Sequence, residues 1–326
     1  MTRMICRIAL SLVLAALLGR PTMAQRVVLP GTGAKVAGDD FEDVQWKYNS
    51  NGPKSSRNLD KRTRAPLGIS DNGLWFESAK RGHPDLIKRV TPPKGGIPGS
   101  KGAMLMRTRQ SGVPGYTSAT SQQDDFLFDT RHGAIPVHMS PNITVRVFLP
   151  PFDKWEKSTD TSFGYRAALM ATTYEYKRKL FGKRRVAKSE LFYPGMFIQF
   201  QSKADGHAKD SANFIIRADD YGRDFLGPRI TKTGWWTLGM SFTGDGRVHY
   251  FAHHGAGRLT ARDLIYSSSY GGTRFQSFHT FFFDVISKND GKSWSTPWIV
   301  DDPAVHIGSK PVQTAKGASR QGRSSD

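Results

Sequence analysis

Residues 235–252 read WWTLGMSFTGDGRVHYFA, and this stretch decides the fold class. Two runs of alternating aromatic, aliphatic and polar residues flank Gly244-Asp245-Gly246, a pattern that predicts a β-hairpin with a tight turn. Successive side chains on a strand point to opposite faces. In the first run one face holds Trp236, Leu238, Met240 and Phe242, and the other holds Trp235, Thr237 and Ser241. The stretch therefore predicts an antiparallel sheet with one core face and one more polar face.

Strand signals continue on both sides of this hairpin, whereas helical periodicity is nearly absent. We therefore expect an all-β fold, a two-sheet antiparallel jelly-roll β-sandwich with little helix. Besides the hairpin, the expected strands are Leu74–Ser78, Ala103–Arg107, Ile143–Leu149, Tyr165–Tyr176, Met196–Gln201, Asn213–Ala218, Phe278–Ser287 and Trp298–Val300. We expect one domain at 39–308, after a flexible lead-in at 25–38 and before a disordered basic tail at 309–326.

The first 24 residues have the pattern of a secretory signal peptide. Arg3 and Arg7 precede an apolar run of 11 residues, Ile8–Leu18, and small residues end the segment at Ala24. The run is much shorter than the roughly 20 residues that span a bilayer, and no later segment is long and apolar enough to do so. We expect cleavage after Ala24 and a secreted, periplasmic or cell-surface protein.

The chain has one cysteine, Cys6, and a net charge of +19. Cys6 lies inside the predicted signal, so the mature chain would contain no disulfide. The signal holds three arginines and no acidic residue, so most of the positive charge stays on the mature chain. Such a charge attracts polyanions. No DNA- or RNA-binding motif accompanies it, so we expect an anionic polysaccharide rather than a specific nucleic acid as partner.

Three segments resemble the concanavalin A-like lectin/glucanase jelly rolls. Residues 39–46 (DDFEDVQW) resemble the first strand of those domains, and the hairpin at 235–251 is similar to their late hairpin. Residues 281–287 (FFFDVIS) and 297–308 (PWIVDDPAVHIG) would supply the last strands. The resemblance implies a bent sandwich whose concave face holds a glycan.

Hydrolysis of a glycosidic bond usually needs two carboxylates that flank the bond. The hydrolases of this superfamily carry them on one strand as E-x-D-x-x-E or E-x-D-x-E, and neither spacing occurs in this chain. A family-typical hydrolase is therefore not expected.

A polysaccharide lyase acting on a uronic-acid polymer is the enzymatic alternative. It needs a cation or amide to neutralise the uronate and a group that transfers a proton. In alginate-lyase-like jelly rolls these groups lie in an early Arg motif, a middle Q-x-H strand and a late Y-F-K-x-G-x-Y strand. Here Gln201 replaces the middle His, and the late Lys and second Tyr are missing. If the protein is a lyase, the candidate catalytic residues are Arg166, Gln199, Gln201, His249, Tyr250 and His253.

For a binding protein, the main candidate is the segment 177–188 (KRKLFGKRRVAK), read as a basic loop with seven basic residues that contact a polyanion. Trp235 is the candidate to stack on a sugar ring, because alternation places it opposite the core-facing Trp236. The candidate ligand-binding residues are Trp235, Arg107, Arg109, Lys177, Arg178, Lys179, Lys183, Arg184 and Arg185. A strand end with solvated histidines is the favoured interpretation of 247–254.

The resemblance also implies a structural calcium ion where the first and last strands meet. Asp40, Glu42 and Asp301 are the acidic residues in the corresponding regions, and Ca²⁺ prefers oxygen ligands. No other cofactor is expected. The sequence thus predicts a secreted protein that binds a polysaccharide on its concave face, with a lyase and a non-catalytic structural surface protein as the alternatives.

Overall fold

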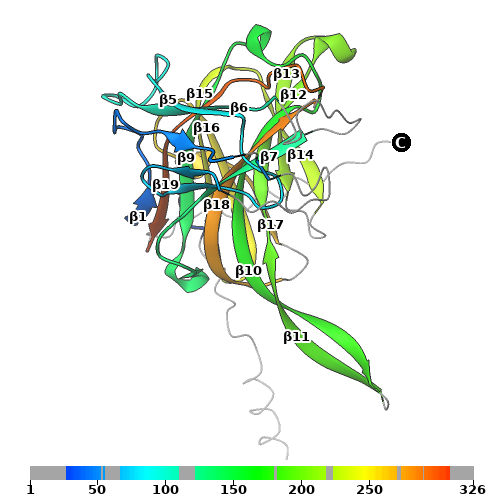
Figure 1. Ribbon diagram of the computed structural model, residues 1–326. Coiled ribbons are helices and arrows are strands. Elements are labelled where there is room, and N and C mark those ends of the chain that lie inside the picture. Colours follow the sequence, from blue (N-terminus) through cyan, green and yellow to red (C-terminus); the bar gives the residue numbers. More distant parts are fainter. Residues whose placement is uncertain are drawn as a thin grey trace, which may run out of the picture.

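The computed structural model describes residues 27–52, 54–55, 67–109, 122–179, 182–217, 223–269, 273–288 and 290–308. In this part of the chain two antiparallel sheets pack face to face, and the helical segments are short 3-10 turns (Figure 1). The predicted all-β jelly-roll sandwich is confirmed. The predicted signal peptide with Cys6 and the predicted tail at 309–326 lie outside the described residues.

The smaller sheet has eight strands. Its order is β17 (Leu264–Ser269), β16 (Arg247–His254), β15 (Gly234–Phe242), β9 (Asn142–Leu149), β19 (Trp298–Ile307), β6 (Ala103–Arg107) and β5 (Leu86–Val90). The eighth strand, β1 (Ala34–Gly38), pairs with β19. The predicted hairpin is β15–β16, in which Met240 lies opposite Tyr250.

The larger sheet has eleven strands. Its order is β14 (Asp224–Ile230), β13 (Ser211–Arg217), β12 (Gly195–Gln201), β10 (Ser162–Lys179), β18 (Phe275–Ser287), β7 (Gln122–Phe128), β4 (Trp75–Glu77), β3 (Ile69–Ser70) and β2 (Tyr48–Asn49). Two further strands are β11 (Gly182–Phe192), which pairs with β10, and β8 (Ile135–Pro136), which pairs with β18. The 3-10 turns are η2 (Val137–Met139), η3 (Phe152–Lys154), η4 (Lys203–Asp205) and η5 (Ala261–Asp263).

Aromatic side chains fill the space between the sheets. Trp75 is fully buried and stacks on Phe126 and Phe283, with ring centroids 5.1 and 5.4 Å apart. Trp298 of the smaller sheet meets Phe163 of the larger sheet at 5.4 Å. Fully burying one such side chain contributes roughly 1.5–3 kcal/mol. This core fixes which face of each strand points outward.

Three expectations about the chain path are wrong. The lead-in at 25–38 contains β1, which pairs with β19. The segment 39–46 is a loop rather than the first strand, because Phe41 adopts a left-handed φ of 56° and Asp39 accepts hydrogen bonds from the indoles of Trp46 and Trp75. The described residues of 177–188 belong to a long two-stranded ribbon that projects from the sandwich, in which β10 extends to Lys179 and β11 begins at Gly182 (Figure 1).

The predicted polar face of β15 is also buried. Trp235, Thr237 and Ser241 are each at most 4% exposed. The Trp235 indole donates a hydrogen bond to the Pro93 carbonyl (3.1 Å), and a Cβ added to Gly96 would lie 3.1 Å from its ring. Trp235 therefore has no free face for a sugar ring. Trp235, Thr237 and Ser241 do share one face of β15, as the alternation predicts, but the segment that contains Pro93 and Gly96 covers Trp235 on that face.

Candidate functional site

The outer face of the larger sheet carries two neighbouring hollows of about 340 and 220 Å³. Strands β7, β18, β10, β12 and β13 alternate between aromatic side chains that enter the core and mixed polar and aromatic side chains that line these hollows. The first hollow is lined by Ser78, Lys80, Arg81, Asp125, Leu127, Arg166, Ala168, Leu191, Tyr193, Arg217, His279, Thr280 and Phe282. The second is lined by Gln123, Asp160, Ser162, Phe197, Gln199, Ile215, Arg217, Asp224 and Ile286. Because Arg217 lines both, we call the two hollows together the outer groove.

Arg166 forms the floor of the groove. Its guanidinium lies 5.1 Å from the centroid of the Phe282 ring and 5.8 Å from that of Phe197. It donates two hydrogen bonds to the Tyr193 carbonyl (2.9 and 3.3 Å) and lies 3.4 Å from an Asp284 carboxylate oxygen. With its side chain 8% exposed, this cation is held rigidly beneath the surface.

Two carboxyl groups meet beside Arg166. Asp125 of β7 lies directly opposite Asp284 of β18, and the Asp284 side chain is fully buried. Burial and the neighbouring Asp284 carboxylate raise the pKa of Asp125 well above its usual range. Arg81 lies 3.8 Å from the Asp125 carboxylate on the solvent side. The raised pKa favours protonated Asp125, which limits the negative charge on this face.

Arg217 connects the two hollows. Its guanidinium lies 4.8 Å from the centroid of the Phe197 ring and forms two hydrogen bonds to Asp224, at 2.7 and 2.8 Å. The amide of Gln199 donates to Asp160 (2.8 Å) and that of Gln123 to Asp125 (2.8 Å). Guanidinium groups, amides and aromatic rings therefore line two hollows that share Arg217. Such groups can hydrogen-bond hydroxyl and carboxylate oxygens and contact the apolar face of a ring.

The six lyase candidates do not converge. Arg166, Gln199 and Gln201 belong to the larger sheet, whereas His249, Tyr250 and His253 belong to β16 of the smaller sheet. Because the core separates the two outer faces, the six side chains cannot surround one substrate.

The candidate proton-transfer residues of β16 have other surroundings. His249 is buried between Ser267 (2.7 Å) and Thr243 (3.2 Å), and burial lowers its pKa to about 4. Tyr250 is fully buried and its hydroxyl donates to the Arg217 carbonyl (3.3 Å). His253 contacts Asp263 (2.9 Å) on the outer face of the smaller sheet. These contacts stabilise the fold. The favoured interpretation of solvated histidines is wrong for His249, which is buried, whereas His253 is partly exposed and His254 is exposed.

Among the groove residues only Arg166 and Gln199 were predicted from the sequence, and the others were missed, including Arg81, Tyr193, Arg217 and His279. His279 lies at a β-bulge, where the pairing of β18 with β10 shifts between Thr280 and Phe278. A bulge inserts an extra residue and reverses the alternation that follows it. Simple alternation along FHTFFF therefore could not assign the faces on both sides of His279, and no signal in the sequence marks Tyr193.

Arg107 and Arg109 flank one indole. Their guanidinium carbons lie 5.3 and 5.7 Å from the centroid of the Trp294 ring, and Arg107 donates to the Ser295 carbonyl (2.9 Å). Neither residue lines the outer groove. The sequence-predicted pair is thus brought together, but at a place separate from Arg166 and Gln199.

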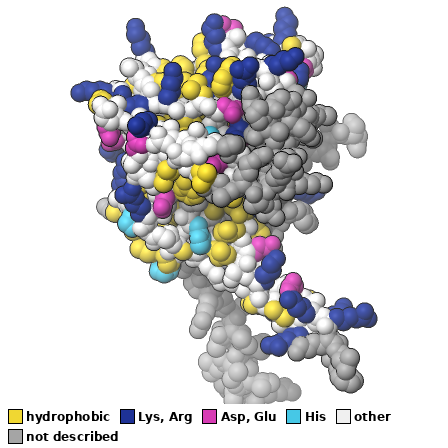
Figure 2. Space-filling view, viewed as in Figure 1, with side chains coloured by type: hydrophobic (Ala, Val, Ile, Leu, Met, Phe, Trp, Pro, Cys, Tyr) yellow, Lys and Arg dark blue, Asp and Glu magenta, His cyan; other side chains and the backbone are white. Residues whose placement is uncertain are grey.

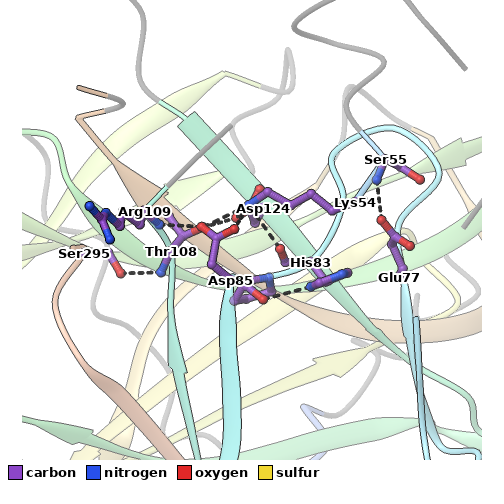
Figure 3. A network of polar contacts seen from close by, with 10 residues as sticks. Lys54, Ser55, Glu77, His83, Asp85, Thr108, Arg109, Asp124 and Ser295 are labelled. Carbon is purple, nitrogen blue, oxygen red and sulfur yellow. Dashed lines mark hydrogen bonds and ion pairs between the residues drawn. The ribbon is translucent and has the colours of Figure 1, made fainter. Parts of the chain in front are cut away.

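A buried polar network joins the two sheets near Arg109 (Figure 3). The Lys54 ammonium lies 2.7 Å from Asp124 of β7 and 3.0 Å from Asp85, which precedes β5. Thr108 donates to Asp124 and its backbone N–H donates to Ser295 (2.9 Å). Burial raises the pKa of Asp124 to about 7 even with Lys54 beside it. Because Lys54, Thr108 and Asp124 are buried and already paired, we interpret the network as a structural link between the sheets.

The three predicted calcium ligands line one hollow of about 370 Å³, with Ser100 between them. Ser100 donates to Glu42 (3.1 Å) and Asp301 (3.0 Å), and burial raises the pKa of Asp301 to about 6. Glu42 also accepts backbone hydrogen bonds from Lys101 (2.9 Å) and Gly102 (3.2 Å). Within the described residues no group of three or more His, Cys, Asp or Glu side chains could hold a metal ion. A calcium ion held by Asp40, Glu42 and Asp301 stays a prediction.

The basic residues of 177–188 lie on the β10–β11 ribbon, away from the sandwich (Figures 1 and 2). The side chains of the described basic residues are exposed: Lys177, Arg178, Lys183, Arg184, Arg185 and Lys188. Lys179 lies at the end of β10, opposite Gly182 of β11. The predicted set is therefore brought together on one projecting element.

No protein-family model and no curated protein matches the sequence. Among solved structures, the chain is similar to the alginate lyase Aly36B, with 9% identity, a TM-score of 0.42, and coverage of 86% of this chain and 98% of that one. It is also similar to an endo-β-1,4-glucuronan lyase from the fungus Trichoderma reesei, with 10% identity, a TM-score of 0.39, and coverage of 84% and 96%. The globular domain of T. cruzi calreticulin matches at 8% identity, a TM-score of 0.36, and coverage of 84% and 88%. Likenesses this weak do not assign a site or an activity to this chain. Within the described residues no helix could cross a membrane.

Proposed function

We propose that the protein binds an anionic polysaccharide in the outer groove of the larger sheet. The observation that carries this proposal is the arrangement of Arg217, Arg166 and Arg81 among the aromatic rings of Phe197, Phe282 and Tyr193 along one continuous face. A guanidinium group carries five N–H donors, so besides its partners within the protein it can also donate to the carboxylates or sulfates of such a polymer. The aromatic rings and the amides of Gln123 and Gln199 would contact the sugar rings and their hydroxyls.

The charge of the whole chain supports an anionic ligand. Even without the three arginines of the predicted signal peptide, the chain keeps most of its net charge of +19, which raises the local concentration of polyanions and increases their rate of association. Inside the groove the cations Lys80, Arg81, Arg166 and Arg217 outnumber the acids Asp125, Asp160 and Asp224, and burial raises the pKa of Asp125. Binding should therefore weaken as salt is added, because salt screens these contacts.

Binding rather than cleavage is the function that this geometry supports best. The predicted proton-transfer candidates His249 and Tyr250 are buried in the smaller sheet, so the predicted catalytic set does not assemble, and a lyase reaction in the groove would need Tyr193 or His279 instead. A lyase reaction would be detected by the ultraviolet absorbance of the unsaturated product when the protein is incubated with alginate, polygalacturonate or glucuronan. We expect no such absorbance.

The test of binding is retention on immobilised alginate, polygalacturonate and heparin, with neutral dextran as the reference. We expect retention on at least one anionic polymer and none on dextran. Arg217→Gln should weaken that binding about tenfold, as expected for the loss of a charge-assisted contact. Arg262→Gln is the matched control, because Arg262 is exposed on η5 beside the smaller sheet and its loss removes the same charge. Equal affinities for dextran and the anionic polymers, or equal effects of the two variants, would refute the proposal.

A further inference from the structure

The β10–β11 ribbon has two chemically different faces. Its strands pair without a register shift from Leu169 opposite Phe192 to Lys179 opposite Gly182. Directly opposite residues share a face, and successive residues alternate between faces. Ala168 and Leu191 line the outer groove, so the face to which they belong can be followed outward along the ribbon.

The face that continues from the groove, which we call the tyrosine face, combines aromatic and basic side chains. Its pairs are Met170 with Leu191, Thr172 with Ser189, Tyr174 with Ala187, Tyr176 with Arg185, and Arg178 with Lys183. Tyr174 is 55% exposed and Tyr176 is 70% exposed. The Arg185 guanidinium carbon lies 3.6 Å from the centroid of the Tyr174 ring. No carboxylate belongs to this face among the described ribbon side chains.

The opposite face carries carboxylates that neutralise part of its charge. Glu175 forms an ion pair with Lys177 (3.0 Å), and Glu190 lies 3.6 Å from Lys188. Glu190 also accepts a hydrogen bond from Thr173 (3.1 Å). If the basic residues only kept the ribbon from aggregating, Glu175 and Glu190 would not need to lie on the same face. The segregation leaves Arg178, Lys183 and Arg185 on the tyrosine face without an acidic neighbour on that face.

We propose that the tyrosine face is a second binding surface for the same anionic polysaccharide, which extends from the outer groove along the ribbon. This inference rests on the proposed function of the groove. Tyr174 and Tyr176 are two residues apart on one strand, which places the residues about 7 Å apart along it, so their exposed side chains can contact successive parts of an extended polymer. The basic side chains between and beyond them pair with its carboxylates or sulfates. Strand residues from 172 to 179 extend the contact by about 26 Å beyond the sandwich.

A polysaccharide fits this face better than a lipid surface. The exposed aromatic residues are tyrosines in one row that continues into a hollow, whereas a membrane would be met by a broad apolar face with the cations at its edges. A polymer that lies in the groove can reach the row without bending away from the sheet.

The experiment compares a short and a long ligand on three double variants. The ligand is alginate, as a tetrasaccharide and as the long polymer, or the corresponding forms of whichever anionic polymer retains the wild-type protein. Arg178→Ser with Arg185→Ser removes two charges from the tyrosine face. Lys177→Ser with Arg184→Ser removes two charges from the opposite face and is the matched control. Tyr174→Ser with Tyr176→Ser tests the aromatic rings.

We expect both tyrosine-face variants to bind the long polymer about tenfold more weakly than the wild type, with unchanged affinity for the tetrasaccharide. The opposite-face variant should change the affinity for the polymer much less. Equal losses for the two charge variants, no loss for any of them, or retention of wild-type protein only by anionic phospholipid vesicles would overturn the inference. If Arg217→Gln weakens binding while the ribbon variants do not, only this inference fails. If the wild type binds no anionic glycan, the proposed function fails as well. Thermal unfolding of each variant checks that the fold is retained.

Discussion

Replacement of Lys54 by Met should destabilise the protein strongly. The Lys54 side chain is 5% exposed and its ammonium contacts the fully buried Asp124 (2.7 Å) as well as Asp85 (3.0 Å). Methionine fills a similar volume but leaves a buried carboxylate without its partner. Breaking a buried ion pair in this way typically costs 3–5 kcal/mol, so we expect a loss of about 3 kcal/mol in the free energy of unfolding at pH 7.

The pH dependence of this loss gives the sharper test. In the wild type, burial raises the pKa of Asp124 to about 7 while Lys54 acts to lower it, so Lys54→Met should raise that pKa further. Above pH 7 the folded variant then keeps a proton that the folded wild type and both unfolded chains have released. Stability falls with pH wherever the folded state binds more protons than the unfolded state. The loss should therefore grow from pH 7 to pH 9, by up to about 1.4 kcal/mol per pH unit.

Urea unfolding followed by tryptophan fluorescence at pH 6, 7 and 9 measures both effects. Lys154→Met is the matched control, because the side chains of Lys154 and its partner Asp153 are 69% and 68% exposed. Exposed pairs of this kind contribute roughly 0–1 kcal/mol. The interpretation of the network as a structural link is refuted if Lys54→Met costs no more than Lys154→Met at pH 7. It is also refuted if the loss does not increase with pH.

Two further predictions concern stability. Burial raises the pKa of Glu156 from its usual value near 4.5 to about 7. Between pH 4.5 and pH 7 the folded chain therefore keeps a proton on Glu156 that the unfolded chain has lost. Because the folded state binds more protons, the free energy of unfolding decreases as the pH rises through this range. Glu156→Gln should therefore gain stability relative to the wild type from pH 5 to pH 7 in urea titrations, and parallel curves for the two proteins would contradict this. Trp235→Ala should lower the free energy of unfolding by about 3–5 kcal/mol, as for other buried tryptophans, while the affinity of the folded protein for an anionic glycan stays unchanged. A selective loss of glycan affinity at full stability would restore Trp235 as a ligand-binding residue.

The strands themselves were predictable from the sequence because alternation is a local property. Each of the ten expected strands coincides with an observed strand, and the hairpin around Gly244-Asp245-Gly246 is the turn between β15 and β16. Strand β11 was not predictable in this way, because its charged residues resemble a solvated loop and its pairing depends on β10. Strand β1 likewise gains its regular structure from β19.

The candidate site was less predictable than the fold. Arg166 and Gln199 were expected and do line the outer groove, since both lie on strands whose alternation is regular. His249 was grouped with them although it lies on the other sheet, and a sequence does not state which strands share a sheet. Trp235 was placed on the correct face of its strand, but the segment that covers it lies about 140 residues earlier in the chain.

The unpaired edge of β11 has a consequence for the behaviour of the protein at high concentration. Within the described residues β11 pairs only with β10, so its other edge leaves backbone donors and acceptors open along eleven residues. An open edge of this length is a template on which a second copy could add a strand. Lys183, Arg184, Arg185 and Lys188 place like charges where two such edges would meet. The same cations that are available to a polymer thus oppose aggregation of the free protein.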